Sequence, residues 1–303
     1  MACRETFLRA VAGTIRGVLR GAIAAVVTPL TSGGSGLDGS GFAPLVRFLA
    51  DGGIDGVLAC GTTGEGILLS IGERKAAAEA FLDGRPVGFQ VAVHAGAQTT
   101  SETVALAAHA KEIGADAVAV IAPPYFPLGE DEIVAHLRAA AEACEPLPFY
   151  PYEFAGRSGY AIPVRAIERL RELAPNLAGM KVSDTPWGAV EPYALEGLDL
   201  FVGNEPIVLE GLAHGAAGAV SGLATAFPEI VSALVHERSR EASERVTTLR
   251  RLLGPLPFHA ALKEILIARG VPIRPVVRAP LRGLTEEERG RALAAAREVG
   301  AIG

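Results

Sequence analysis

Eight short apolar runs, separated by longer stretches of helical character, constrain the fold of this chain more than any other feature. One intervening segment, Glu130–Glu145, places Ile133, Leu137 and Ala140 on one face, the pattern of an amphipathic helix. Glu102–Gly114 is a second segment of this kind. The apolar runs are Gly21–Val27, Gly56–Ala59, Gly88–Val93, Ala117–Ile121, Pro148–Tyr152, Leu177–Val182, Leu200–Val202 and Gly218–Ser221.

Repeated strand–helix alternation predicts parallel strands, and eight parallel strands close well into a barrel. The competing architecture is an open doubly wound sheet, which more often has a glycine-rich GxGxxG loop after its first strand. Here the first apolar run is followed by Thr28–Gly36, TPLTSGGSG, which lacks that spacing. We therefore predict an α/β fold of the (β/α)8 TIM-barrel type.

The pattern changes after Ser221, where the segments become helical. Thr285 and Glu288 are placed as N-cap and capping-box residues of the last segment. The predicted helices cover 228–236, 241–253, 259–269 and 285–299. We predict an N-terminal extension at 1–20, the barrel at 21–225, and a C-terminal helical region at 226–303 that packs on the barrel.

Charge and cysteine usage limit the possible partners and compartments. The net charge of −6 offers no basic face, so we predict no nucleic-acid partner. Cys3, Cys60 and Cys144 include no CxxC pair, which suits a reducing compartment and argues against a structural zinc site. No apolar run is long enough for a membrane span or a secretory signal. We expect a cytoplasmic protein with no membrane partner; a transit peptide or an extra helix are the alternatives for the N-terminal segment.

Lys181 stands in the apolar run LAGMKV, near the end of the sixth predicted strand. Barrel active sites lie at the C-terminal ends of the strands. Burial lowers the pKa of an amine, and a neutral amine is the nucleophile that attacks a ketone to form an imine. The alternative, equally open on this run alone, is a lysine that extends to solvent or pairs with Asp184.

Tyr152 ends the preceding predicted strand. Adjacent strands lie about 5 Å apart, so its phenol can exchange protons with groups at the lysine. Tyr150 points the same way in a regular strand, and the pattern does not choose between the two. Either tyrosine can instead be a packing residue whose hydroxyl has a structural partner.

The turn after the second predicted strand reads Gly61-Thr62-Thr63-Gly64-Glu65. Converging backbone N–H groups and the two threonine hydroxyls suit a carboxylate such as that of pyruvate. The alternative is a tight turn in which Thr62 or Thr63 caps the next helix.

Weaker candidates stand at other strand ends. Asn204 and Glu205 follow the seventh predicted strand and can meet the tail of a substrate, as can Ser183 and Asp184. His94 can line the mouth of the barrel, although a lone histidine is more often structural. The acidic residues at strand ends are too scattered for Mg²⁺, so we predict no metal site.

Several motifs, in order and spacing, resemble the dihydrodipicolinate synthase / N-acetylneuraminate lyase family from about Gly17 to the end of the chain. They are GAIAAVVTPL, GTTGE, APPYFP, YEFAGRSG, GMKVSD and GAAGAVS. The resemblance implies that Lys181 forms a Schiff base with pyruvate or another 2-oxo acid. It also selects Tyr152 over Tyr150 as the general acid/base.

The resemblance implies further roles. Thr62 and Thr63 hold the carboxylate and relay protons, beside Gly61. Arg157 falls where the synthase branch binds the second substrate's carboxylate, and Val220 and Ser221 lie at the strand beside bound pyruvate.

The activity implied is that of an aldolase acting on a 2-oxo acid and an aldehyde, without metal or organic cofactor. A hydro-lyase on the same lysine, acting on a 2-keto-3-deoxy sugar acid, is one alternative. A non-catalytic barrel that binds small acids is another. The family habit is a homotetramer built as a dimer of dimers.

Two departures place the chain between branches of the family. Pro124-Tyr125-Phe126 replaces a PYY stretch, so Phe126 lacks the hydroxyl that completes a proton relay across a dimer interface in the synthase. Glu153 replaces the usual asparagine or histidine. KVSDT and LPFYPY look like animal-type sialic acid lyases, whereas Arg157 is similar to the synthase branch. The acceptor aldehyde and the physiological direction therefore stay open.

Overall fold

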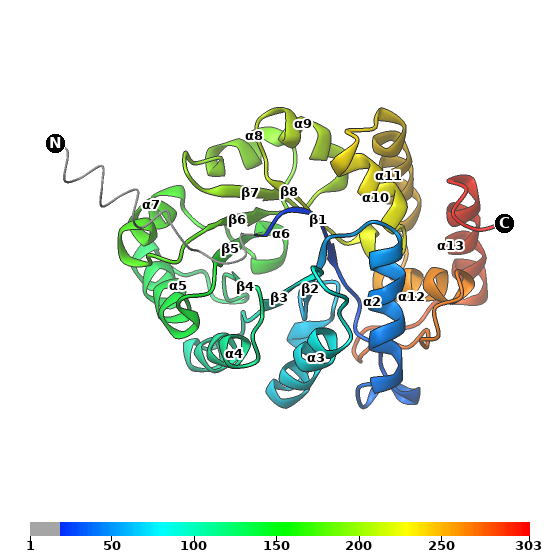
Figure 1. The fold of residues 1–303 in the computed structure, drawn as a ribbon, viewed down its shortest axis with the longest axis horizontal. Helices are drawn as coiled ribbons and strands as arrows, with labels where there is room; N and C mark the ends of the chain where they lie inside the picture. Colours follow the sequence, from blue (N-terminus) through cyan, green and yellow to red (C-terminus); the bar gives the residue numbers. More distant parts are fainter. Residues whose placement is uncertain (1–18) are drawn as a thin grey trace.

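Eight parallel strands close into a barrel in the computed structural model, which describes residues 19–303 (Figure 1). The strands follow one another around the barrel in chain order, and β8 pairs with β1. The strands are β1 (Gly21–Ala25), β2 (Gly56–Ala59), β3 (Gln90–His94), β4 (Ala117–Ile121), β5 (Phe149–Glu153), β6 (Gly179–Val182), β7 (Asp199–Val202) and β8 (Gly218–Ser221). The predicted TIM barrel is confirmed.

Helices surround the strands, one after each strand, with the short α6 (Ala155–Ser158) added after β5 (Figure 1). The surrounding helices are α2 (Phe42–Asp51), α3 (Ile71–Asp83), α4 (Thr100–Glu112), α5 (Glu130–Cys144), α7 (Val164–Leu173), α8 (Trp187–Val190), α9 (Val208–Ala213) and α10 (Pro228–His236). Short 3-10 turns include η3 (Gly66–Leu68), η5 (Glu205–Ile207) and η6 (Leu223–Thr225).

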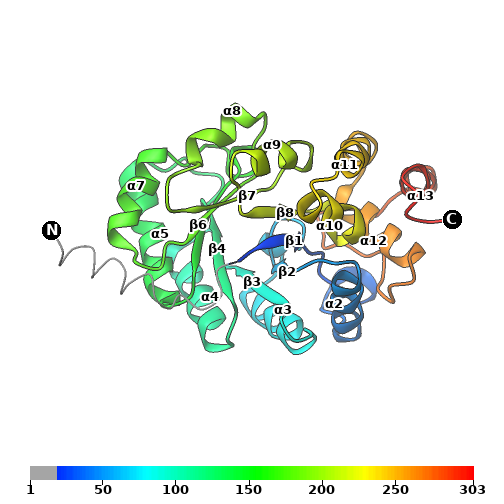
Figure 2. The same ribbon diagram turned by 45° about the horizontal axis from the view of Figure 1, so that its top comes forward.

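The helix α10 packs against β1 and β8 and is therefore the eighth helix of the barrel, although the predicted boundary at 225 counts it with the C-terminal region. Three helices follow: α11 (Arg240–Leu253), α12 (Phe258–Ala268) and α13 (Glu286–Glu298). They lie to one side of the barrel, beyond α10 and α2 (Figure 2). The predicted capping box of the last helix is present, with Thr285 as its N-cap.

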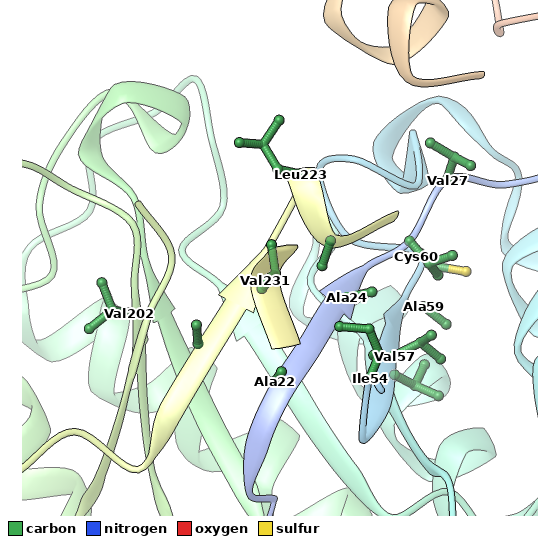
Figure 3. Close-up of a cluster of buried hydrophobic side chains, with 14 of the residues drawn as sticks. Ala22, Ala24, Val27, Ile54, Val57, Ala59, Cys60, Val202, Leu223 and Val231 are labelled. Carbon is green, nitrogen blue, oxygen red and sulfur yellow. The ribbon is translucent and has the colours of Figure 1, made fainter. Parts of the chain in front are cut away.

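The strands separate two apolar cores because successive side chains point to opposite faces. Figure 3 shows Ala22 and Ala24 of β1 in the outer core, near Val57 of β2 and Val231 of α10. The inner core fills the barrel, and consists of Leu19, Ile23, Ala25, Leu58, Ala92, Ala117, Ala119, Tyr150, Phe201 and Val220. The barrel is thus packed rather than hollow, and a small molecule can enter only at an end.

Three further findings concern membrane spans, the cysteines and the N-terminal segment. No helix within residues 19–303 has the length and apolar character needed to cross a membrane. Cys60 and Cys144 are free, buried thiols. The predicted N-terminal extension lies outside the described residues, apart from Leu19 and Arg20.

Candidate active site

Lys181 lies at the C-terminal end of β6 and points into the barrel, between Tyr152 on β5 and Phe201 on β7, with which it is in register. Its side chain is enclosed, with 5% of the residue exposed. Nζ lies 3.4 Å from the centre of the Tyr152 ring. Among residues 19–303 no carboxylate lies within salt-bridge distance of it. The lysine therefore neither extends to solvent nor pairs with Asp184.

The surroundings of Lys181 lower the pKa of its amine. Burial lowers the pKa of the Lys181 amine, and the nearby Tyr152 opposes this in part. The charge of Arg250 acts in the same direction as burial. Because the ammonium form is disfavoured, the neutral amine, which is the nucleophilic form, is available at lower pH than for an exposed lysine.

Tyr152 lies near the C-terminal end of β5, in register with Lys181. Its hydroxyl lies 3.3 Å from Oγ1 of Thr62. Burial opposes ionisation, but Lys181, Thr62 and Ser183 together lower the pKa of the Tyr152 phenol. The Tyr150 hydroxyl instead accepts a hydrogen bond from the backbone N–H of Leu19 at 3.2 Å, at the N-terminal end of the barrel. Tyr152, and not Tyr150, therefore lies beside Lys181.

The turn that contains Thr62 and Thr63 is held from the C-terminal region. His259 of α12 contacts the carbonyl oxygen of Thr62 at 3.0 Å. Glu65 is buried in a left-handed conformation, with φ of 58°. Neither threonine caps the next helix, because Ser70 is the N-cap of α3. The alternative interpretation of this turn as a helix cap is therefore wrong.

A cavity of about 230 Å³ lies above Lys181. It adjoins a larger and more apolar cavity of about 490 Å³, and Thr62, Arg157 and His259 line both. Of the predicted site residues, the smaller cavity is lined by Lys181, Tyr152, Thr62, Thr63, Arg157, Asn204 and Val220, and Gly61 lines the larger. Eight of the ten predicted residues, drawn from five strands and their loops, therefore meet in one place.

Arg157 reaches the cavity from α6, with its guanidinium 5.6 Å from the centre of the Phe154 ring. The loop that carries it is fixed by Glu153, whose Oε2 accepts a hydrogen bond from the N–H of Ile162 at 2.6 Å. Burial, followed by the neighbouring Asp184, raises the pKa of Glu153 to about 8. The residue that departs from the family pattern is thus a support of this loop.

Ser221 and Glu205, which the sequence predicts as substrate-binding residues, do not line either cavity. Val220 points into the barrel, so the next residue, Ser221, points outward. Glu205 is fully buried, and its Oε1 accepts hydrogen bonds from Oγ of Ser221 at 2.7 Å and from the N–H of Leu223 at 3.0 Å. Both residues lie outside the cavity and contact each other beside the residues that line it.

Four residues that line the smaller cavity come from the C-terminal region and were not predicted: Arg250, Gly254, Phe258 and His259. Nothing in their local sequence distinguishes them, since Arg250 stands beside Arg251 on a helix with many charged residues. Phe126 does not line either cavity; Tyr125 and Phe126 are 82% and 71% exposed.

Comparisons with known proteins agree with this arrangement. An uncharacterised DapA-like lyase of Halobacterium salinarum is 36% identical over 282 residues, or 89% of this chain and 91% of the relative. The N-acetylneuraminate lyase of Mus musculus is 37% identical over 212 residues, or 67% of this chain and 65% of the relative. The solved structure of Proteus mirabilis N-acetylneuraminate lyase superposes with a TM-score of 0.84 at 29% identity, covering 94% of this chain and 99% of that one.

A family model gives the broadest match. Residues 18–298, which include every strand of the barrel and all three C-terminal helices, match the model of the dihydrodipicolinate synthetase family. A match of this extent, together with the relatives and the shared fold, settles the family. This chain belongs to the dihydrodipicolinate synthetase family.

Proposed function

We propose that Lys181 forms an imine with the keto carbon of pyruvate or another 2-oxo acid, and that the chain makes or breaks a carbon–carbon bond beside it. Its family and named relatives are lyases, and the chain is a lyase of the class I aldolase type. The observation that carries the proposal is the enclosed Lys181 amine, 3.4 Å from the Tyr152 ring, in a cavity at the C-terminal end of the barrel.

Imine formation uses the amine and the phenol together. The lone pair of Lys181 Nζ attacks the keto carbon, and the keto oxygen takes a proton from the Tyr152 hydroxyl, giving a carbinolamine. The attacking nitrogen, now positively charged, gives a proton to the Tyr152 phenolate, which passes it to the hydroxyl of the carbinolamine. That hydroxyl leaves as water, and an iminium and the phenolate of Tyr152 remain. The short distance between the two side chains supports this role.

The iminium then acts as an electron sink. The phenolate of Tyr152 removes a proton from the carbon next to the iminium, giving an enamine. That carbon attacks the carbonyl carbon of an aldehyde, whose oxygen takes a proton from Tyr152. Water hydrolyses the new iminium, which releases the product and the free amine, and the reverse sequence cleaves the bond.

The 2-oxo acid must be held with its keto carbon near Nζ. We assign its carboxylate to the turn with Gly61, Thr62 and Thr63, where backbone N–H groups and hydroxyls can donate to an anion. Thr62 also contacts the Tyr152 hydroxyl at 3.3 Å, so it can pass protons between the tyrosine and the substrate.

We further propose that the protein is a cytoplasmic homotetramer, a dimer of dimers, that needs no metal or organic cofactor. The lysine itself supplies the electron sink. Two buried free thiols suit a reducing compartment. Sedimentation at four times the monomer mass would support the tetramer.

Intact mass after incubation with pyruvate and borohydride tests the imine. We expect a reduced pyruvyl adduct on the wild type and on Lys111→Ala, which changes an exposed lysine of α4, but not on Lys181→Ala. An adduct on Lys181→Ala, or none on the wild type with pyruvate or bulkier 2-oxo acids, would overturn the proposal. In cleavage assays, release of pyruvate distinguishes an aldolase from a hydro-lyase, which releases water only.

A further inference from the structure

The loop 154–162, here called the cavity loop, forms one wall of the site. Phe154 lines the smaller cavity, and Arg157 lines both cavities. The loop connects β5 to α7 and includes the short α6. Oγ of Ser158 donates to the carbonyl oxygens of Phe154 at 3.1 Å and of Tyr160 at 2.6 Å, which holds the loop together from within. We therefore expect the loop to move as a unit, with a position set by its attachments to the barrel.

Two carboxyl groups hold the ends of the cavity loop. At its start, the N–H of Ala155 donates to Oδ2 of Asp184 at 3.4 Å. At its end, the N–H of Ile162 donates to Oε2 of Glu153 at 2.6 Å. Glu153 ends β5 and Asp184 follows β6, so the two carboxyl groups lie on neighbouring strands of the barrel. The position of the loop therefore depends on how these two groups stand relative to each other.

Glu153 faces away from the cavity. Tyr152 and Lys181 line the smaller cavity, and side chains alternate along a strand, so the side chain of Glu153 points outward. Its carboxyl group is fully buried, and within residues 19–303 its Oε1 has no hydrogen-bond partner. Ionisation would leave this oxygen charged and without a donor, whereas a proton on it would make it a hydrogen-bond donor.

The surroundings of Glu153 supply a second carboxyl group and no cation. The titratable groups that face it are Asp184, Tyr160 of the cavity loop and Tyr193 of η4 (Glu191–Tyr193). Burial raises the pKa of both tyrosines, which therefore stay neutral. In the described part of the chain, no lysine, arginine or histidine lies within salt-bridge distance of Glu153 or Asp184. Two neighbouring carboxyl groups without a cation are most stable when they hold one proton between them.

We propose that Glu153 and Asp184 are positioning residues that hold the cavity loop by sharing one proton, and that loss of this proton releases the loop and withdraws Arg157 from the cavity. Without the proton, two neighbouring carboxylates repel each other in a buried place. Asp184 is the less buried of the two, so its bond to Ala155 is the first to break. Burial and the neighbouring Asp184 raise the pKa of Glu153 to about 8, so we expect the release near this pH.

Cleavage by trypsin tests the proposal, because Arg157 is the arginine of the cavity loop and a loop must leave its protein to enter a protease. Arg238, an exposed arginine between α10 and α11, provides a reference site in the same sample. Mass spectrometry of the first fragments at pH 7, 8 and 9 gives the rate at Arg157 divided by the rate at Arg238, which removes the pH dependence of trypsin itself. In the wild type we expect this ratio to rise about tenfold, the change in population that corresponds to one unit of pKa difference.

Matched variants identify the groups that titrate. Glu153→Gln and Asp184→Asn each remove one carboxyl group and keep its size and an acceptor oxygen. In both we expect the ratio to stay at the wild-type value for pH 7 throughout. Glu142→Gln, which changes an exposed carboxyl group of α5, should keep the wild-type rise. Circular dichroism at pH 7 shows whether each variant is folded, and either of the two clamp variants suffices if the other is not.

Three results would overturn the proposal. The first is a wild-type ratio that does not change between pH 7 and pH 9. The second is a rise of wild-type size in Glu153→Gln and Asp184→Asn, which would mean that another group controls the loop. The third is a high ratio already at pH 7 in both variants, which would give the two side chains a fixed structural role without a shared proton. Failure to trap pyruvate on Lys181 would be distinct, because it would remove the proposed function and leave the cleavage result unchanged.

Discussion

At the scale of single residues, the amine of Lys181 and the phenol of Tyr152 control each other's protonation. Each lowers the cost of the charged form of the other, while burial of both disfavours charge. The lysine has its pKa below the ordinary value of about 10.5, so the rate of imine formation should rise with pH and level off below that value. The Tyr152 hydroxyl therefore also affects the pKa of the Lys181 amine.

Tyr152→Phe keeps the ring beside Nζ but removes the hydroxyl. We expect kcat to fall by about 10²- to 10⁴-fold, the usual contribution of a general acid/base, with little loss of folding stability. The matched control is Tyr150→Phe, whose hydroxyl serves the opposite end of the barrel and whose loss should leave kcat near the wild-type value. Steady-state cleavage assays of both variants measure this, and equal effects would contradict the assignment.

Glu153 predicts a pH dependence of stability. Its pKa is raised to about 8 in the folded chain, so the folded chain binds this proton more tightly than the unfolded chain does. The stabilisation from the protonated form is complete below the ordinary carboxyl pKa and is lost as the pH rises through about 8. Glu153→Gln, which keeps an acceptor for Ile162, should remove this loss, on the order of a few kcal/mol, in urea unfolding at pH 5 and pH 8.5. An equal pH dependence in both proteins would contradict it.

The sequence predicts a site residue well when nearby residues alone fix its position, and poorly when a distant part of the chain fixes it. Lys181, Tyr152 and Thr62 stand at strand ends within distinctive motifs, and the barrel brings strand ends together. Glu205 also follows a strand, but its orientation depends on Arg250, 45 residues later on α11. A buried carboxylate requires a cationic partner, yet nothing in the local sequence says which of the 28 lysines and arginines it is.

At the scale of elements, the threonine turn and the C-terminal region are joined by a buried ion pair. Lys263 of α12 donates to Oε1 of Glu65 and to the carbonyl oxygen of Val276, each at 2.6 Å. Oε2 of Glu65 accepts from the N–H of Arg278, also at 2.6 Å. The threonine turn after β2 is therefore held by residues about 200 positions later.

Lys263→Met should be strongly destabilising because it leaves the Glu65 carboxylate buried without its cation. A loss of about 3–5 kcal/mol in the free energy of unfolding is expected for breaking such a pair. Arg138→Met breaks the exposed pair with Glu142 on α5 and should cost less than about 1 kcal/mol. Similar losses in chemical denaturation would show that Glu65 does not depend on Lys263.

The elements themselves were largely predictable. Apolar runs of strand length alternate with amphipathic segments, and the eight runs correspond to the eight strands with shifts of a few residues at their ends. The role of α10 was not predictable, because nothing in its own sequence indicates which strands it packs on. What makes it part of the barrel is its packing on β1 and β8, a contact between distant parts of the chain.

At the scale of the whole molecule, the exposure of Tyr125 and Phe126 is not explained by the packing of a single chain. The two exposed rings pack edge to face, with centres 4.8 Å apart, and Tyr125 adopts a left-handed backbone with φ of 87°. Exposed aromatic pairs are typical of protein–protein contacts. They therefore suit an interface of the proposed homotetramer.

Replacing both rings, in Tyr125→Ser/Phe126→Ser, should lower the mass measured by sedimentation without unfolding the monomer. The reason is that the side chains contribute little to the core of one chain but would be buried between chains. Val87→Ser changes an apolar side chain that is fully exposed in a turn and should leave the mass unchanged. A tetramer that survives the double change would place the interface elsewhere.

The pairing of β1 with β8 has a consequence for how the protein is made. One edge of β1 stays without its partner until β8 has been synthesised, about 200 residues later, which takes roughly 10–40 s at translation rates of about 5–20 residues per second. An open strand edge recruits strands from other chains. Yield in a cell should therefore depend on translation speed and on chaperones that shield a nascent edge, even though the finished barrel has no edge to protect.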